Sequence, residues 1–327
     1  MRLLNFMAQI IEIQSNGIAE IKLPSVKLSY QIFGKQICEA PVVLINHALT
    51  GNSSVTGENG WWKEIVGEGK VIDTNKYTII AFDLSGNQNH PDQTTANGDR
   101  FFSLCQIAKL QLKALDLLGV KKLFAIVGGS LGGGLAWEMW VQEPNIAEYI
   151  IPIASHWQSS SWVQAICKIQ EEAIQLSDHN LDLARKFSMF FYRNSGNFSA
   201  KFKDDKGVFV AGEKAVSWLD YHGKALSKRV TSSAYMNVLY LLSNINALND
   251  KEAFDVALSI TRSKFCLVGF DSDILFPFAG ISECNTVLNK YGIVTDSYEI
   301  ETNYGHDAFL IEYEKLAQLI QPIFETH

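Results

Sequence analysis

One serine lies among five glycines in the stretch Val127 to Gly134, VGGSLGGG. Its core, Gly128-Gly129-Ser130-Leu131-Gly132, is a G-x-S-x-G pattern, which is typical of a nucleophilic serine at a sharp strand-to-helix turn. The residues two before and two after such a serine come close together, so we expect glycine there on steric grounds. The chemistry would be attack of the Ser130 hydroxyl on an acyl carbon.

Phosphate binding is the main alternative for a glycine-rich turn. A phosphate-binding loop needs GxxxxGK followed by Ser or Thr, and no such dipeptide follows these glycines. A dinucleotide site needs GxGxxG and an acidic residue for the ribose, and this stretch supplies neither. The pattern therefore favours a nucleophile.

A serine hydroxyl needs a base, and that base needs an orienting carboxylate. In proteins with this kind of turn the chain order is serine, acid, histidine. Asp271 and Asp273 follow a predicted strand in LVGFDSDILFP, and their spacing does not choose between them. Among seven histidines, His306 is preferred because it follows the acid and lies between the last predicted strand and a helix.

Acyl transfer passes through a tetrahedral oxyanion, which two backbone N–H groups can stabilise. One donor is expected from Leu131, directly after the serine. The other is expected from Leu49, in the loop NHALTGN after an early strand. His47 begins that loop, and we expect it to brace the loop rather than to react.

The elements around these residues indicate an α/β fold with a parallel sheet. Short, uniformly apolar runs such as 42–45 and 78–82 are typical of strands buried on both faces. Antiparallel strands are expected before Gly34. An amphipathic helix over 104–118, a strand before Ser130 and a helix after it continue the alternation. Further strands are predicted near 146–155, 263–270 and 297–305.

The alternation stops between 156 and 259, where the pattern is helical. We therefore predict a core domain of residues 1–155 and 260–327, with a helical lid inserted over 156–259.

Composition excludes several classes of protein. Hydrophobic residues make up 47% and charged residues 19%, with a net charge of −7. An acidic chain without a basic stripe predicts no nucleic-acid partner. No apolar run reaches the length of a membrane span. Five scattered cysteines without CxxC spacing favour reduced thiols in a cytoplasmic protein over disulfides, and predict no metal site.

Several segments resemble the homoserine O-acetyltransferase family, whose members have the α/β-hydrolase fold. They cover the chain from about residue 25 to the C-terminus, in the family's order. The matching segments are INHALTGNS, GWWKEIVGEGKVIDTNKY, VGGSLGGGLAWEMW, DLARKFSMFFYRN, LDYHGKALSKRVTSSAY, DSDILFP and YGHDAFLIEYEKL.

The resemblance implies a catalytic triad of Ser130, Asp273 and His306, and so prefers Asp273 to Asp271. It also implies that a lid arginine and tyrosine, Arg229 and Tyr235, contact homoserine, with Asp307 meeting its amino group. An arginine fork suits a carboxylate, and a carboxylate suits an ammonium. Arg193 is a competitor for the arginine's role.

The implied reaction is two displacements through an acyl-enzyme, with acetyl-CoA as a substrate and no permanently bound cofactor. The chain departs from the family in having DLSGNQNHPDQTTANGDRFF after the strand at 78–82, RVTSSAY in the lid, and a shortened lid. These changes touch substrate selection and leave the triad intact. The sequence leaves three points open: acetyl or succinyl donor, homoserine or serine acceptor, and transferase or hydrolase with the same triad. Lid segments as apolar as AYMNVLYLLSNI also suggest a homodimer that packs through the lid.

Overall fold

A twisted eight-stranded sheet forms the centre of the molecule. The computed structural model describes residues 8–16, 18, 21, 23–84, 102–177, 180–203 and 213–325. The strand order is β1-β2-β6-β3-β7-β8-β9-β10, antiparallel at β1–β2 and β2–β6 and parallel from β6 onward. The strands are β1 (Gln9–Gln14), β2 (Ser25–Gly34), β3 (Val42–Asn46), β6 (Thr78–Phe82), β7 (Leu123–Gly129), β8 (Ala147–Ile153), β9 (Lys264–Phe270) and β10 (Thr295–Ile300); β4 (Val66–Gly67) and β5 (Ile72–Asp73) pair separately.

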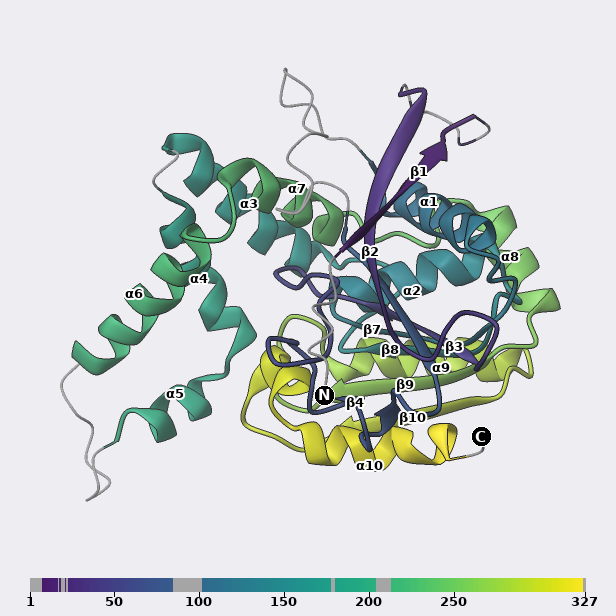
Figure 1. Cartoon of the computed structure of the whole chain (residues 1–327). Helices are drawn as coiled ribbons and strands as arrows, with labels where there is room; N and C mark the ends of the chain where they lie inside the picture. The colour runs from purple at the N-terminus through teal and green to yellow at the C-terminus, as the bar shows by residue number, and fades with distance from the viewer. Residues whose placement is uncertain are drawn as a thin grey trace.

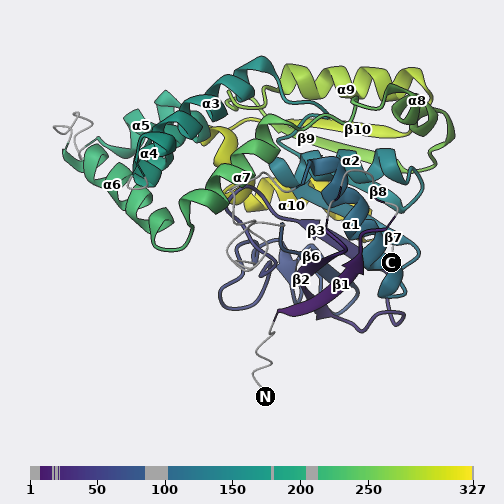
Figure 2. The same ribbon diagram turned by 90° about the horizontal axis from the view of Figure 1, so that it is seen from above.

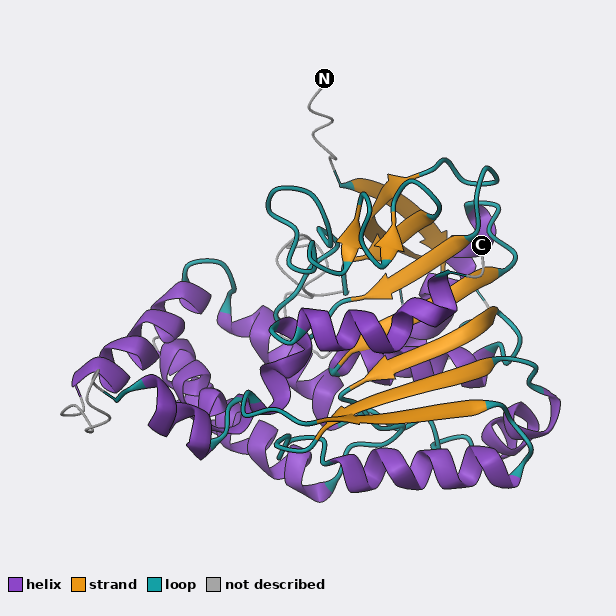
Figure 3. Ribbon diagram, turned by 90° about the horizontal axis from the view of Figure 1, so that it is seen from below, coloured by secondary structure: helices purple, strands orange, loops and turns teal. Residues whose placement is uncertain are grey.

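The central strands are buried along their whole length, which explains their uniformly apolar sequences. Every residue of β3, β6 and β7 is buried. Helices cover both faces of the sheet, so neither set of side chains meets water (Figure 3). The outermost strand, β1, was not predicted. It is mostly exposed, and such an edge strand lacks the strong apolar signal of the central ones.

Two apolar clusters fill the space between the sheet and its helices. One cluster packs α1 (Leu104–Leu117), α2 (Leu131–Gln142), α8 (Lys251–Ile260) and α9 (Phe278–Lys290) against one face. The other packs α10 (Tyr313–Phe324), the short helix η3 (Gly305–Leu310) and Trp62 against the opposite face. This is the predicted α/β arrangement of a mostly parallel sheet flanked by helices. Figure 2 shows α8 and α9 near the end of the sheet formed by β9 and β10, away from β1.

A helical insertion joins β8 to β9. We use "the insertion" for α3 (Ser161–Leu176), α4 (Leu181–Tyr192), α5 (Ser195–Lys201), α6 (Glu213–Ser227) and α7 (Ser232–Ser243). Figure 1 shows α4, α5 and α6 projecting to one side of the sheet. The next helix, α8, packs on the core instead, with the rings of Phe254 and Trp140 5.6 Å apart. The predicted lid of 156–259 therefore includes one helix that covers the core.

The two chain segments that lead into and out of the insertion are bonded to each other. Ser159 N–H donates to Ile245 O at 2.8 Å, and Ala247 N–H donates to Trp157 O at 2.8 Å.

No helix among the described residues is long and apolar enough to cross a membrane.

Candidate active site

Ser130 occupies a strained turn between β7 and α2. Its φ of +56° and ψ of −122° lie outside the regions that L-residues ordinarily adopt, at a cost of about 1–3 kcal/mol. A Cβ on Gly128 would lie 2.2 Å from Gly132 O, and one on Gly132 would lie 2.2 Å from Asn46 O. Side chains at either position would therefore prevent the turn. The glycine pattern has the steric cause expected from the sequence.

The structure brings the three predicted triad residues into one hydrogen-bonded relay. His306 Nε2 lies 2.7 Å from Ser130 Oγ, and its Nδ1 lies 2.7 Å from Asp273 Oδ2. All three residues are at least 95% buried. With Nδ1–H donated to the carboxylate, Nε2 is the acceptor for the serine proton. This is the geometry of a serine activated by a general base.

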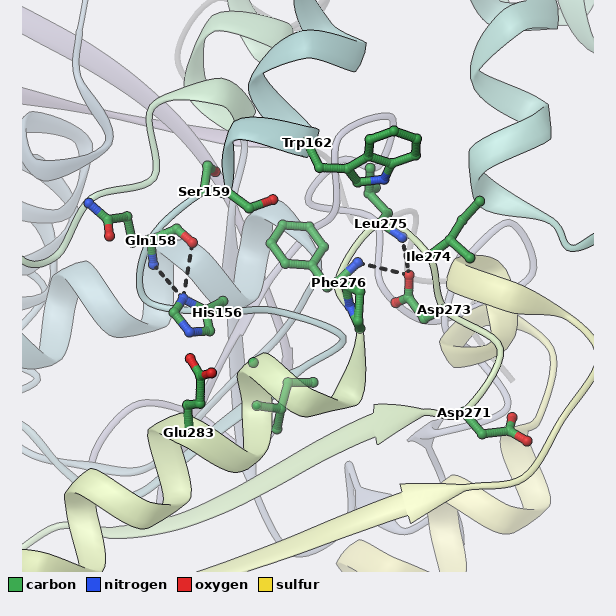
Figure 4. Close-up of a pocket in the computed structure, with 14 residues that line it drawn as sticks. His156, Gln158, Ser159, Trp162, Asp271, Asp273, Ile274, Leu275, Phe276 and Glu283 are labelled. Carbon is green, nitrogen blue, oxygen red and sulfur yellow. Dashed lines mark hydrogen bonds between the residues drawn. The ribbon is translucent and has the colours of Figure 1, made fainter.

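Asp273 is held by backbone donors from its own loop. Its Oδ1 accepts N–H bonds from Leu275 at 2.8 Å and Phe276 at 2.9 Å, which leaves Oδ2 for His306 (Figure 4). Asp271 Oδ1 accepts instead from Thr302 N–H at 2.9 Å, beyond the end of β10. The structure thus distinguishes the partners of two carboxylates, which their spacing in the sequence did not.

A cavity of about 850 Å³ adjoins this loop, and Ser130 is not among its lining residues.

The loop that carries Leu49 is braced by buried polar groups. His47 Nδ1 lies 2.7 Å from Ala48 O, and His47 Nε2 accepts Leu84 N–H at 3.0 Å. Burial lowers the pKa of His47, partly offset by the nearby Asp83 carboxylate, so the ring is neutral at pH 7. Asp83 also accepts the N–H and hydroxyl of Ser53, at 2.8 and 3.0 Å. His47 therefore braces the loop, as expected.

The second predicted donor, Leu131, is the first residue of α2. A first-turn N–H has no acceptor within its own helix, and the positive end of the helix dipole lies there. Both properties suit stabilisation of an oxyanion beside Ser130.

The predicted substrate residues lie in three different settings. Arg229 is exposed and donates through Nη1 to Thr50 O at 3.2 Å, next to Leu49. Tyr235 is completely buried, and its hydroxyl donates to Gln170 Oε1 at 2.9 Å, so it has no free face for a substrate. Asp307 follows His306 and is already paired with Arg193, whose Nε lies 2.9 Å from Asp307 Oδ2.

Two residues near the triad were missed by sequence reasoning. The ring of Tyr192 lies 5.8 Å from that of His306, and the guanidinium of Arg185 lies over the Tyr192 ring, 5.2 Å from its centre. No carboxylate among the described residues pairs with Arg185. Arg185 and Tyr192 are seven residues apart and share one face of α4, a spacing that could have pointed to them. Tyr192, not Tyr235, is thus the insertion's tyrosine beside the histidine.

The donor set does not suggest a metal centre. Within the described ranges, no group of three or more His, Cys, Asp or Glu residues could hold an ion.

The architecture defines the class of this protein as one with the α/β-hydrolase fold. A family model described as the alpha/beta hydrolase fold matches residues 41–193. The chain is 30% identical to the homoserine O-acetyltransferase of Nautilia profundicola, over 87% of this chain and 88% of that protein. It is 29% identical to that of Moorella thermoacetica, over 93% and 91% of the two chains.

The chain therefore belongs to the homoserine O-acetyltransferase family, a family of O-acyltransferases, which confirms the resemblance found in the motifs. The crystal structure of homoserine O-acetyltransferase from Bacillus anthracis superposes with a TM-score of 0.84 at 19% identity, covering 97% of each chain. Esterase E22 superposes with a TM-score of 0.82 at 19% identity, covering 97% of this chain and 99% of that one. These structural likenesses confirm the fold.

Proposed function

We propose that this protein transfers an acetyl group from acetyl-CoA to the hydroxyl of homoserine, or of a similar hydroxy amino acid, through an acyl-enzyme. The observation that carries the proposal is the buried Ser130–His306–Asp273 relay in a member of this family. A relay alone serves many acyl transfers. The family membership supports a hydroxyl acceptor over water.

In the first half-reaction, Ser130 Oγ attacks the thioester carbonyl carbon while His306 Nε2 takes the hydroxyl proton. The N–H groups of Leu131 and Leu49 stabilise the oxyanion, and Asp273 stabilises the imidazolium. The carbon–sulfur bond then breaks, and His306 returns its proton to the leaving thiolate. The products of this step are CoA and an acetyl ester on Ser130.

In the second half-reaction, His306 takes the proton of the acceptor hydroxyl, whose oxygen attacks the acetyl ester. The same two N–H groups stabilise the second oxyanion. The bond to Ser130 Oγ then breaks, and the serine regains its proton from His306. One oxyanion site and one base therefore serve both steps, which is the advantage of a covalent intermediate.

The insertion supplies groups to hold an acceptor over Ser130. Arg185 and Arg229 are the cations we propose for its carboxylate, since arginine binds carboxylates through two parallel N–H bonds. Arg229 contacts the loop of Leu49, and Arg185 contacts the tyrosine beside His306. Tyr235 of α7 donates to Gln170 of α3 and so joins these two helices of the insertion.

Hydrolysis by the same triad is the competing function. It differs only in that water attacks the acyl-enzyme, so a transferase must exclude water from the site. The triad side chains are almost completely buried. Such burial is compatible with either acceptor, so the preference for transfer rests on the family membership.

The test is thiol release from acetyl-CoA, measured with and without homoserine, together with mass-spectrometric detection of O-acetylhomoserine. We expect release that depends on homoserine and an equal amount of the ester. Ser130→Ala should abolish both. Release at full rate without an acceptor would establish a hydrolase, and turnover by Ser130→Ala would refute the nucleophile.

A further inference from the structure

Two adjacent tryptophans hold two separate parts of the site. Trp61 and Trp62 belong to the GWW segment, and their side chains take no part in the proposed reaction. Trp61 Nε1 donates to Asn52 O at 2.8 Å, in the loop that carries the proposed oxyanion donor. Trp62 Nε1 donates to Phe309 O at 3.1 Å, in the short helix η3 that carries His306. One pair of neighbouring residues therefore contacts both the loop of the oxyanion donor and the helix of the base.

The two indole rings form one stacked unit. Their centres lie 5.2 Å apart with the ring planes 16° from parallel, and Trp62 is completely buried. The backbone is fixed as well, because Trp62 N–H donates to Val55 O at 3.0 Å. A Cβ on Gly60 would lie 2.3 Å from the Cα of Thr56, so glycine is required just before the pair. Movement of one ring would therefore disturb the other.

Phe309 connects Trp62 to the triad. Its ring is buried, and the ring centre lies 5.7 Å from that of His306, edge to face at 71°. A Cβ on Gly129, the residue before Ser130, would lie 2.7 Å from the Phe309 ring. The ring therefore contacts both the base and the strand end that leads into the nucleophile, while Trp62 fixes the carbonyl of the same residue.

A hydrogen bond from a buried indole is common in proteins and does not by itself indicate a role in a site. Trp140 provides the comparison within this chain. It is completely buried and donates through Nε1 to Thr261 Oγ1 at 3.1 Å, near the end of α2 that lies away from Ser130. Trp61 and Trp62 differ from it because their acceptors lie in the two segments that must stay aligned with the nucleophile.

We propose that Trp61 and Trp62 are positioning residues that act as one unit, which keeps the Leu49 N–H and His306 Nε2 aligned on Ser130 Oγ during acylation. This inference rests on the proposed roles of Ser130 and Leu49. Acyl transfer is sensitive to such alignment, because a misplacement of about 1 Å can lower a rate about a hundredfold. Loss of either indole N–H should therefore slow acylation without weakening substrate binding.

The test is acylation by p-nitrophenyl acetate under single-turnover conditions, with the protein in excess. Ser130 Oγ attacks the ester carbonyl carbon, its proton passes to His306, and p-nitrophenolate leaves, so the assay needs neither CoA nor homoserine. Trp61→Phe and Trp62→Phe keep an aromatic ring but lose the N–H group. We expect each to lower the maximal rate constant about tenfold or more and to change the half-saturating concentration less than about threefold.

The double variant tests whether the two tryptophans act as one unit. Effects of residues that act together are strongly non-additive. Trp61→Phe combined with Trp62→Phe should therefore acylate at most about threefold more slowly than the slower single variant. Two independent roles would instead multiply to a loss of about a hundredfold or more.

Trp140→Phe is the matched control, because it removes a buried indole N–H bond away from the site. It should leave the maximal rate constant within about twofold of the wild-type value. Urea unfolding checks that each variant is folded under the assay conditions. Trp61 is only half-buried, so Trp61→Phe decides the outcome by itself if Trp62→Phe does not fold.

Slower acylation in both single variants, with a non-additive double variant, supports the proposal. An unchanged maximal rate constant in either single variant, a multiplicative double variant or an equal loss in Trp140→Phe overturns it. A wild-type protein that is not acylated at Ser130 would refute the nucleophile and this inference together. Acylation without transfer to homoserine would reject only the proposed acceptor.

Discussion

At the scale of single residues, two neighbouring aspartates have different partners. Asp273 is fixed by two N–H groups and directs its free oxygen at His306, whereas Asp271 binds Thr302. Only the first arrangement holds the imidazole with Nδ1 protonated and Nε2 free to accept a proton. The charge of Asp273, and not only its shape, therefore matters to the proposed reaction.

We expect Asp273→Asn to lower kcat by about four orders of magnitude, as removal of the same charge does in serine proteases, because the amide favours the wrong imidazole tautomer. Initial rates of thiol release under saturating substrates measure this. Asp271→Asn is the matched control and should change kcat less than about tenfold, because its amide oxygen can still accept from Thr302. Equal losses in both variants would reject the assignment of Asp273 as the acid.

At the scale of elements, each part of the site depends on a contact between segments far apart in the chain. The loop after β3 is held by Asp83 and Leu84 at the end of β6, and α4 lies on the turn before His306. His47 contributes to the first contact only while Nε2 is unprotonated. The loop that carries Leu49 should therefore weaken in acid.

The free energy of unfolding should fall as the pH drops below about 6.5, because the lowered pKa of His47 makes the unfolded chain bind more protons there than the folded one. His47→Asn should be less stable at pH 7.5 but should lose less on going to pH 5.5, by up to about 1.4 kcal/mol. Urea unfolding at both pH values measures the difference. His156 and His222 also have lowered pKa values and are present in both proteins, so they cancel. An identical pH dependence would contradict this account of the brace.

At the scale of the whole molecule, the insertion carries an exposed apolar face. Trp162, Ile169 and Leu176 recur every seven residues along α3 and are 49%, 50% and 84% exposed. Leu183 and Phe190, on α4, are also about half exposed, at 51% and 52%. Several large exposed apolar side chains on two packed helices are typical of association sites. The sequence suggested a homodimer from the apolar segment AYMNVLYLLSNI, but the apolar residues of that helix, α7, are mostly buried within the molecule. We place the homodimer instead on the exposed residues of α3 and α4, and the dimer stays a prediction.

We expect sedimentation velocity to show a dimer at micromolar concentration and Ile169→Glu with Leu176→Glu to shift it to monomer, because charges would be buried in the interface. Leu117→Glu is the control, since Leu117 is 58% exposed on α1, away from the insertion. Circular dichroism checks that the variants fold. A monomeric wild type, or a dimer that survives both substitutions, would place any interface elsewhere.

The sequence by itself determined the alternation of strands and helices, the nucleophile turn and the chain order of the triad. These depend on local rules: apolar periodicity, the space that only Gly128 and Gly132 leave, and motifs that the family shares. These rules did not predict the mostly exposed strand β1, because its apolar pattern is weak.

The tertiary structure decided which polar groups meet. Nothing in the spacing of Asp271 and Asp273 shows that one carboxylate points to His306 and the other to Thr302. Nor does the sequence show that Tyr235 is enclosed by the insertion while Tyr192 lies beside His306. The pairing of Arg193 with Asp307 joins residues more than a hundred positions apart. Such contacts depend on how α4 packs on the end of the sheet, and that packing is set by the whole chain.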